Sequence, residues 1–385
     1  MFCFFFKPFG LQNYTFFLKY ESFFEKKFVL QDFFCIFAPK MKKNEQFYRH
    51  LYAWYAENRR VLPWRETTDP YCIWVSEIIL QQTRVQQGID YYLRFIDRFP
   101  TVDDLACATE DEVLRMWQGL GYYSRARNLH KGARYITEER RHLQSPDWFP
   151  ADYDELRRIP GVGDYTAGAI ASFAYDLPYP APDGNVYRVL ARLNDDETPF
   201  DTTEGKKRFR KQDCDLLDQT QPRLFNSALM ELGALVCTHP TPDCEVCPVS
   251  DYCLGLKHNT AALLPVRKSR PAVRDRYFCY TIYLNGDKTL IRQRTEKDIW
   301  HHLWEFPLEE VEAFPERKAP LLGEFTHQLS HQRIHARFYI EKVPELPPVP
   351  LTYAVKLSEL DDYALSRLTL KALDLISESV SRVLF

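Results

Sequence analysis

The sequence predicts a two-domain protein, in which a mainly α-helical N-terminal domain is followed by a smaller α+β domain. Three observations support this fold class. Apolar residues recur at helical spacing from Met41 to Cys237, and four closely spaced cysteines end this region. Strand-like patterns begin only at Tyr277. At 385 residues, the chain is long enough for two such domains.

The first forty residues differ from the rest, because 13 of the chain's 27 phenylalanines precede Met41. No apolar run there is long enough to span a bilayer, and the segment lacks the features of a signal peptide. One interpretation is a membrane-binding or partner-binding extension. We favour an upstream start codon with Met41 as the native beginning, so we expect residues 1–40 to lie outside the native domain.

From Met41 onward the periodicity predicts ten helices. They cover Phe47–Tyr55, Ile73–Gln86, Gly88–Asp97, Asp111–Trp117, Ser124–Thr137, Tyr153–Arg158, Thr166–Ala174, Val186–Leu193, Lys207–Leu217 and Arg223–Cys237. We place this domain at 41–257 and a basic linker at 258–275. In the last domain, 276–385, a turn at Asn285 and Gly286 predicts a β-hairpin of 277–284 and 289–294. Further strands are expected around Phe325 and over 334–340.

The four cysteines have the spacing C-x6-C-x2-C-x5-C, and they are Cys237, Cys244, Cys247 and Cys253. Four thiols this close together indicate one metal centre, and thiolates select zinc, cuprous copper or iron–sulfur clusters. Zinc sites usually contain two short Cys-x-x-Cys pairs, whereas this loop has one. A structural zinc loop and a group of reduced core cysteines remain the alternatives.

A glycine-rich turn joins two predicted helices at Ile159–Thr166. Gly161 and Gly163 permit a tight turn that presents free backbone amides at the start of the next helix. Such a helix N-terminus can bind a phosphate group. The alternative is a simple connection between two helices.

Two carboxylic acids are candidates for catalysis. Glu77 lies among apolar residues, which favour its protonated form, and Gln81 shares its helix face. Asp183 lies directly before a helix, where it can face a cation that forms when a glycosidic bond breaks. The alternatives are a solvent-facing glutamate and a helix-capping aspartate.

The net charge of −3 gives no global signature of nucleic-acid binding, so any basic surface must be local. The segments 115–141 and 257–276 are candidates, although each is also compatible with an ordinary solvated surface. Ten cysteines without a signal peptide indicate a reducing compartment.

Residues 41 to about 340 resemble the adenine DNA glycosylases of the MutY family, which belong to the endonuclease III superfamily of helix-hairpin-helix proteins. The matching segments are 62–65, 74–83, 119–129, 159–166, 183–192, 230–234 and the cysteine loop 237–253. The resemblance implies removal of adenine mispaired with 8-oxoguanine or guanine in double-stranded DNA, after the adenine is flipped out of the helix. It also implies one [4Fe–4S] cluster held by the four cysteines.

The resemblance further assigns roles to individual residues. Glu77 would protonate the adenine N7, and Asp183 would stabilise the sugar cation, with Tyr165 and Asn185 in the same pocket. Gln82 and Tyr122 would act as wedges in the base stack. The remaining expected DNA contacts are Arg65, Gln81, Thr83, Gly161 and Gly163.

Position 165 separates two kinds of enzyme in this superfamily. Relatives that also cut the DNA backbone have a lysine there, which forms a Schiff base with the sugar. Tyr165 is unable to form this bond, so we expect a monofunctional glycosylase.

The C-terminal domain resembles the MutT-like, or Nudix-type, domain with which this family reads 8-oxoguanine. The segment Trp300–Pro307 matches, whereas the Glu-rich metal-binding helix of active pyrophosphatases is missing. We therefore expect recognition without hydrolysis, with Ser330 and His331 contacting the lesion. Leu329 stands where the family commonly has phenylalanine.

Two other functions remain open, namely a glycosylase for a different mismatch, such as thymine opposite guanine, and a non-catalytic DNA-binding protein that keeps the cluster for structure. We expect a monomer without membrane association in the bacterial cytosol.

Overall fold

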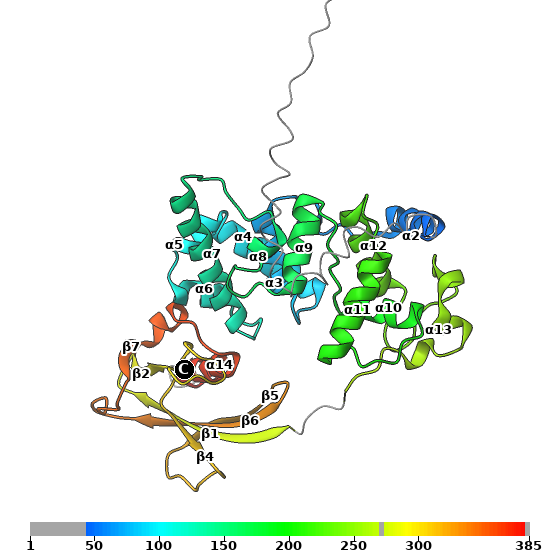
Figure 1. Cartoon of the computed structure of the whole chain (residues 1–385). Helices are drawn as coiled ribbons and strands as arrows, with labels where there is room; N and C mark the ends of the chain where they lie inside the picture. Colours follow the sequence, from blue (N-terminus) through cyan, green and yellow to red (C-terminus); the bar gives the residue numbers. More distant parts are fainter. Residues whose placement is uncertain (1–43, 269–272, 382–385) are drawn as a thin grey trace, which may run out of the picture.

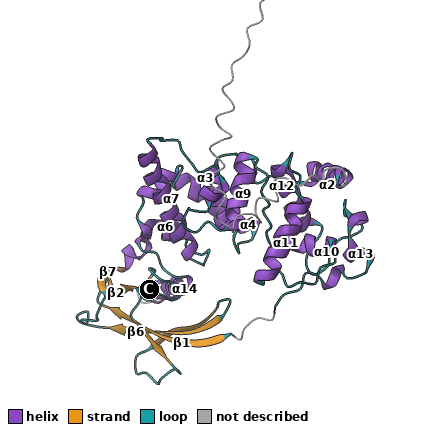
Figure 2. Cartoon of the chain, in the orientation of Figure 1, coloured by secondary structure: helices purple, strands orange, loops and turns teal. Residues whose placement is uncertain are grey.

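The computed structural model describes residues 44–268 and 273–381. The Phe-rich segment 1–40 and residues 269–272 of the predicted linker lie outside the described residues. The described part consists of a helical domain followed by an α+β domain, which confirms the predicted fold class (Figures 1 and 2). Within that part, no helix has the length and apolar character needed to cross a membrane.

The helices of the first domain agree with most of the predicted segments. They are α2 (Glu45–Asn58), α3 (Pro70–Leu80), α4 (Val85–Arg98), α5 (Val102–Cys107), α6 (Glu110–Met116), α7 (Ser124–Leu143), α8 (Tyr153–Leu156), α9 (Asp164–Tyr175), α10 (Gly184–Leu193), α11 (Thr203–Leu216), α12 (Pro222–Leu235) and α13 (Leu254–Lys257). Short 3-10 turns lie at η2 (Pro63–Arg65), η3 (Ser250–Tyr252) and η4 (Ala261–Leu263).

Two apolar cores divide these helices into two groups. The first core is formed mainly by α3 to α9 and contains the fully buried Trp74 and Trp117. The second is formed by α2 and α10 to α12, and the cysteine loop packs against it. In Figure 1 the group around α3 and α9 lies beside the group around α10, α11 and α12. The chain crosses between the groups, so a cleft between them can draw side chains from both.

The predicted helix 73–86 is wrong at its C-terminal end. Helix α3 ends at Leu80, and α4 begins at Val85. Gln81 leaves the helical conformation with ψ 112°, and Gln82 has a left-handed backbone with φ 61°. The apolar periodicity continues across this break, so the sequence pattern could not reveal it. Helix α5 was not predicted; Thr101 and Asp104 form a capping box at its start.

The C-terminal domain contains two sheets and a terminal helix (Figure 2). One sheet has the order β4-β1-β6-β5, and the other has the order β3-β2-β7. The strands are β1 (Arg274–Leu284), β2 (Lys288–Gln293), β3 (Trp304–Glu305), β4 (Leu308–Val311), β5 (Leu321–Gln328), β6 (Gln332–Lys342) and β7 (Tyr353–Lys356), and they are followed by η5 (Leu357–Asp362) and α14 (Arg367–Ser381).

The predicted β-hairpin is wrong in its pairing. The turn exists, because Asn285 and Lys288 form an isolated antiparallel bridge. Strand β1, however, continues into the first sheet, where it pairs in parallel with β6, whereas β2 enters the second sheet beside β7. The strands predicted around Phe325 and over 334–340 are present as β5 and β6.

The two domains contact each other directly. The indole nitrogen of Trp304 donates to Asp111 Oδ1 at 2.9 Å, and Arg127 Nη1 donates to the carbonyl oxygen of His301 at 2.7 Å. Leu303 is fully buried and belongs to the core of the helical domain. These contacts hold residues 301–304, at the start of β3, against α6 and α7.

Candidate active site

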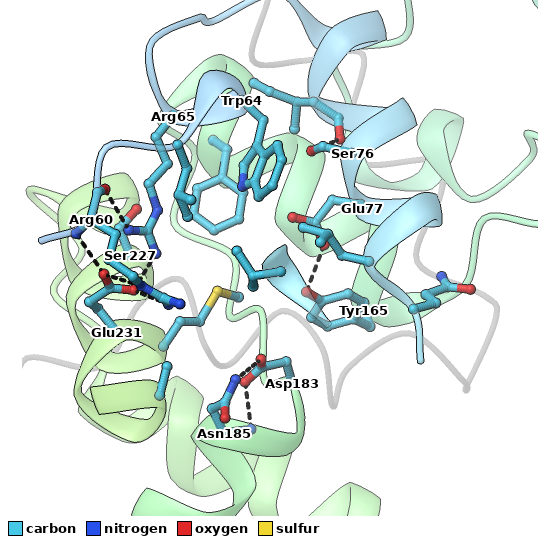
Figure 3. A pocket seen from close by; sticks show the side chains of 18 of the residues that line it. Arg60, Trp64, Arg65, Ser76, Glu77, Tyr165, Asp183, Asn185, Ser227 and Glu231 are labelled. Atoms are coloured by element: carbon cyan, nitrogen blue, oxygen red, sulfur yellow. Dashed lines mark hydrogen bonds and ion pairs between the residues drawn. The ribbon is translucent and has the colours of Figure 1, made fainter. Parts of the chain in front are cut away.

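A cleft of about 860 Å³ lies between the two helical groups. It brings together the predicted residues Arg65, Glu77, Gln81, Gln82, Thr83, Tyr122, Tyr165, Asp183 and Asn185. Glu77 and Tyr165 come from the first group, whereas Asp183 and Asn185 come from the second (Figure 3). The other predicted residues do not line it; these are Gly161, Gly163, Ser330, His331 and the four cysteines.

Glu77 lies near the C-terminal end of α3 and is buried. The helix begins at Pro70 and is capped by Asp69, which accepts hydrogen bonds from the amides of Tyr71 and Cys72. Burial raises the pKa of Glu77 to about 7. The hydrogen bond from Tyr165 opposes this rise, and the nearby Asp183 adds to it. A carboxylic acid with this pKa holds a proton near neutral pH and can donate it.

Tyr165 lies in the first turn of α9 and points at Glu77 (Figure 3). Its hydroxyl donates to Glu77 Oε2 at 2.6 Å. Burial, reinforced by the charges of Glu77 and Asp183, raises the pKa of Tyr165 well above its ordinary value. The phenol therefore stays neutral and acts only as a hydrogen-bond partner.

Asp183 caps the N-terminus of α10 and also lines the cleft. Its Oδ1 accepts from the amides of Asn185 at 2.9 Å and Val186 at 2.8 Å, and its Oδ2 accepts from Asn185 Nδ2 at 2.7 Å. The capping alternative is thus confirmed, and capping leaves the carboxyl facing the cleft (Figure 3). Burial raises the pKa of Asp183, while these three donors oppose the rise by favouring the ionised form.

Arg188 connects this capped carboxyl to the cysteine loop, a link that the sequence did not reveal. Its Nη2 donates to Asn185 Oδ1 at 2.8 Å and to the carbonyl oxygen of Gly233 at 2.6 Å. Its Nε donates to the carbonyl oxygen of Cys237 at 2.6 Å. One guanidinium therefore fixes the amide that holds Asp183 and the first cysteine of the loop.

A buried ion-pair network forms the opposite wall of the cleft. Glu231 on α12 is fully buried and accepts from Arg60 N, Nε and Nη2 at 2.8, 2.9 and 2.7 Å. Arg65 Nη2 donates to Glu231 Oε2 at 2.9 Å (Figure 3). These arginines lower the pKa of Glu231 to about 2, although burial opposes them. Arg65, expected at the DNA, is thus held at this wall of the cleft by Glu231, a residue to which sequence reasoning gave no role.

The four cysteines of the loop line one small cavity next to Arg192. All four are free thiols, and burial raises the pKa of Cys247 to about 12. Arg192 Nη1 lies 3.2 Å from Cys237 Sγ and 2.8 Å from the carbonyl oxygen of Thr238. Among the described residues, no three His, Cys, Asp or Glu side chains are arranged to hold a single metal ion. The four soft donors around one cavity fit a thiolate-bound centre in their chemistry.

The glycine-rich turn has the predicted form. Gly161 has φ 83°, and a Cβ atom there would lie 2.6 Å from Asn128 Cβ, so this position requires glycine. Gly163 is the N-cap of α9, and both glycines are exposed. The turn lies outside the cleft and presents the start of α9 to solvent.

Comparisons with known proteins agree with this architecture. Residues 75–211 match the family model of the HhH-GPD superfamily base excision DNA repair proteins, and residues 279–375 match that of the NUDIX domain. The adenine DNA glycosylase of Buchnera aphidicola subsp. Baizongia pistaciae is 32% identical over 306 residues, which are 75% of this chain and 84% of the relative. The chain belongs to the adenine DNA glycosylase family.

A mammalian relative agrees with this assignment, and one solved structure is similar over the glycosylase domain. The adenine DNA glycosylase of Mus musculus is 32% identical over 372 residues, covering 78% of this chain and 71% of the relative. A solved structure of a thermostable thymine-DNA glycosylase has a TM-score of 0.50 at 26% identity, covering 56% of this chain and 98% of that one.

In this adenine DNA glycosylase, the predicted lesion-reading residues lie at an exposed turn between β5 and β6. Ser330 and His331 are exposed there, and Leu329 N donates to the Gln332 carbonyl oxygen at 2.8 Å. The Ser330 hydroxyl contacts the hydroxyl of Tyr122, which lines the cleft. The turn of the NUDIX domain therefore reaches the cleft of the glycosylase domain.

Proposed function

We propose that the protein removes adenine mispaired with 8-oxoguanine or guanine, by hydrolysis of the N-glycosidic bond after the adenine has been flipped into the cleft. The observation that carries this proposal is the pair of carboxyl groups facing one cleft, Glu77 and Asp183. Glu77 has a pKa near 7, whereas three donors counteract the effect of burial on Asp183. These different environments suit Glu77 to act as the proton donor and Asp183 to act as the ionised carboxylate.

The steps follow from these environments. Glu77 gives its proton to the N7 of the flipped adenine, which makes the base a better leaving group. The C–N bond breaks, its electron pair leaves with the base, and a cation develops on the sugar. Asp183 stabilises that cation. Water then adds to the sugar and gives one proton to the ionised Glu77, which restores the acid for the next cycle. Tyr165 and Asn185 hold the two carboxyls in place through their hydrogen bonds.

A single-turnover assay tests this function directly. Enzyme in excess would be mixed with duplexes that contain adenine opposite 8-oxoguanine, guanine or thymine, and with one that contains thymine opposite guanine. We expect excision of adenine opposite 8-oxoguanine and guanine only. Glu77→Gln should bind the same duplex but excise about 10²–10⁴-fold more slowly.

The similarity to a thymine-DNA glycosylase structure supports a second candidate, namely removal of thymine opposite guanine. That similarity covers 56% of the chain, whereas adenine DNA glycosylase relatives cover about three quarters of it. Excision of thymine but not adenine would establish the second candidate. No excision of either base would favour a DNA-binding role without catalysis.

We further propose that Cys237, Cys244, Cys247 and Cys253 hold one [4Fe–4S] cluster. Family membership, the soft donors and their shared cavity support this assignment. When bound, the cluster would cross-link the loop through four thiolates. Anaerobically purified protein should contain roughly four irons and four sulfides per chain, as expected for one [4Fe–4S] cluster. Stoichiometric zinc without iron would contradict the cluster.

We also propose a monofunctional enzyme, because Tyr165 stands where a lyase needs lysine. The product should be an intact strand with an abasic site, which breaks only after treatment with alkali. Breaks without alkali, together with a borohydride-trapped adduct between protein and DNA, would contradict this proposal.

The lesion opposite the adenine would be read by Ser330 and His331, whose exposed turn reaches the cleft. The expected DNA contacts around it are Arg65, Gln81, Gln82, Thr83, Tyr122, Gly161 and Gly163. We propose a monomer that works in a reducing cytosol. Size-exclusion chromatography with light scattering would test the monomer.

A further inference from the structure

One arginine side chain completes the C-terminal end of the helix that carries Glu77. Arg125 on α7 donates through Nη1 to the carbonyl oxygens of Ile78 at 2.7 Å and Ile79 at 3.1 Å, and it also contacts that of Gln81. The last carbonyl groups of a helix have no partner within the helix and carry partial negative charge. A guanidinium is therefore well matched to this position.

The same side chain also supports a second segment, the turn before α7. Arg125 Nη2 donates to the carbonyl oxygens of Leu120 at 3.4 Å and Gly121 at 3.3 Å. The guanidinium lies 5.2 Å from the centre of the Trp117 ring and 5.8 Å from that of Tyr122. One planar group thus joins two loops that are about forty residues apart in the chain and both border the cleft.

Each of these loops presents one exposed side chain at the cleft in a strained backbone. Gln82 follows the acceptor Gln81 and has φ 61°, and Tyr122 follows the acceptor Gly121 and has φ 48°. A left-handed backbone is strained for a non-glycine residue, and it persists only where the surroundings fix it. The hydrogen bonds from Arg125 to the carbonyl oxygens of the preceding residues fix the backbone at Gln82 and at Tyr122.

We propose that Arg125 is a positioning residue that clamps Gln82 and Tyr122 at a set separation on the rim of the cleft, so that both can enter the base stack when a base leaves it. This inference rests on the base-flipping function proposed above. A flipped base leaves a gap, and protein side chains that insert between bases stabilise such an opened stack. Two inserting groups held by one guanidinium would meet the DNA together.

A matched control lies on the same helix. Arg134 donates through Nε to the carbonyl oxygen of Ala106 at 3.3 Å and through Nη2 to that of Ala108 at 3.4 Å. It supports the C-terminal end of α5 in the same way, but it does not line the cleft. Arg134→Gln therefore shows how the excision rate responds when a helix loses a capping arginine and the rim of the cleft is left unchanged.

The experiment compares Arg125→Gln, Arg125→Lys and Arg134→Gln on two duplexes under single-turnover conditions. The first duplex has adenine opposite 8-oxoguanine between normal base pairs. The second has mismatched pairs on both sides of the same adenine, so its stack is already open. A 2-aminopurine next to the adenine reports the opening of the stack upon binding, and circular dichroism melting checks that each variant is folded.

We expect the excision rate of Arg125→Gln to fall roughly 100-fold on the paired duplex, a loss typical of a misplaced substrate. On the opened duplex the rate should fall less than about tenfold. Arg125→Lys should recover part of the loss, and Arg134→Gln should match the wild type on both duplexes. If Arg125→Gln does not fold, the same comparison between duplexes is made with Arg125→Lys.

Two results would overturn the inference: equal losses of excision by Arg125→Gln on the two duplexes, or a 2-aminopurine signal of Arg125→Gln on binding that equals that of the wild type. In either case Arg125 would act through the stability of α3 alone. No loss at all would also overturn the inference. Failure of the wild-type protein to excise adenine would instead refute the proposed function, so the two failures can be told apart.

Discussion

The hydroxyl of Tyr165 donates a 2.6 Å hydrogen bond to Oε2 of Glu77. This bond favours the ionised form of the carboxyl, whereas burial favours the neutral form and has the larger effect. The resulting pKa of about 7 leaves Glu77 close to half protonated at neutral pH. We therefore expect the balance between one phenol and the surrounding apolar wall to set the pH range of excision.

The first prediction concerns the pH dependence of excision. Because Glu77 must carry a proton, the single-turnover rate should be highest below pH 7 and fall about tenfold per pH unit above it. At acid pH a second decline should appear as Asp183 gains a proton. Rapid-quench measurements from pH 5 to 9, with about 0.5-unit steps, would record both limbs. A rate that increases above pH 7 would contradict the role of Glu77.

The second prediction concerns Tyr165→Phe. The hydrogen bond lowers the pKa of Glu77, so its loss should raise that pKa and move the alkaline limb to higher pH. We expect DNA affinity to stay unchanged, because the phenol faces Glu77. The pH profile of the variant, measured beside that of the wild type, checks this. An alkaline limb that moves to lower pH would show that the hydroxyl stabilises the protonated carboxyl.

The third prediction concerns Arg188, which holds both Asn185 and the carbonyl of Cys237. Arg188→Gln should slow excision roughly 10- to 100-fold, because the Asn185 amide that orients Asp183 loses its own anchor. Arg188→Lys should recover part of the rate. The control is Arg208→Gln, which breaks a pair with Asp196 outside the cleft. A different result would be that Arg188→Gln loses iron while its iron-loaded molecules excise adenine at the wild-type rate. That result would show that Arg188 supports only the cysteine loop.

The fourth prediction concerns Ser330 and His331. 8-Oxoguanine differs from guanine at C8 and N7, and these side chains offer both donors and acceptors to that edge. Replacing both by alanine should reduce the preference for 8-oxoguanine over guanine about 10- to 100-fold, the cost of roughly 1–3 kcal/mol for an unmade buried hydrogen bond. The excision rate at saturating enzyme should hardly change. An unaltered preference would show that the turn does not read the lesion.

The fifth prediction concerns Asp213 on α11, which is fully buried with no hydrogen-bond partner for either carboxyl oxygen. Burial, reinforced by the charge of Asp183, raises its pKa to about 8. An unfolded aspartate ionises near pH 4. Asp213 therefore makes its full contribution to the free energy of unfolding below about pH 4, and this contribution is lost as the pH rises to 8.

Asp213→Asn removes this ionisation while keeping the shape of the side chain. Its melting temperature relative to the wild type should rise from pH 4 to pH 8 and then level off. Thermal melts followed by circular dichroism across this range would measure the difference. A difference that does not vary with pH would show that Asp213 titrates at its ordinary value.

The features that the sequence predicted well are those that depend on neighbouring residues. Asp183 stands directly before α10, and the capping geometry follows from that position alone. The turn at Gly161 likewise follows from glycine and its two flanking helices. Glu77 could be placed on an apolar helix from its immediate neighbours.

The features that were missed depend on contacts between distant segments. Glu231 lies 171 residues from Arg60, and nothing in the local pattern pairs them. The break at Gln82 is stabilised by Arg125, 44 residues beyond Gln81, so the apolar periodicity continued through it. Strand β1 joins a sheet with β6, whose residues lie more than fifty positions later, and this long-range pairing prevails over the local hairpin.

The contacts of Trp304 with Asp111 and of His301 with Arg127 are made by side chains and backbone groups of the two domains themselves. The segment that joins the domains therefore need not determine their orientation; it only keeps them at a high effective concentration. The polypeptide should consequently tolerate a longer connecting segment. Even two separately produced halves, mixed at sufficient concentration, should reassemble through these contacts.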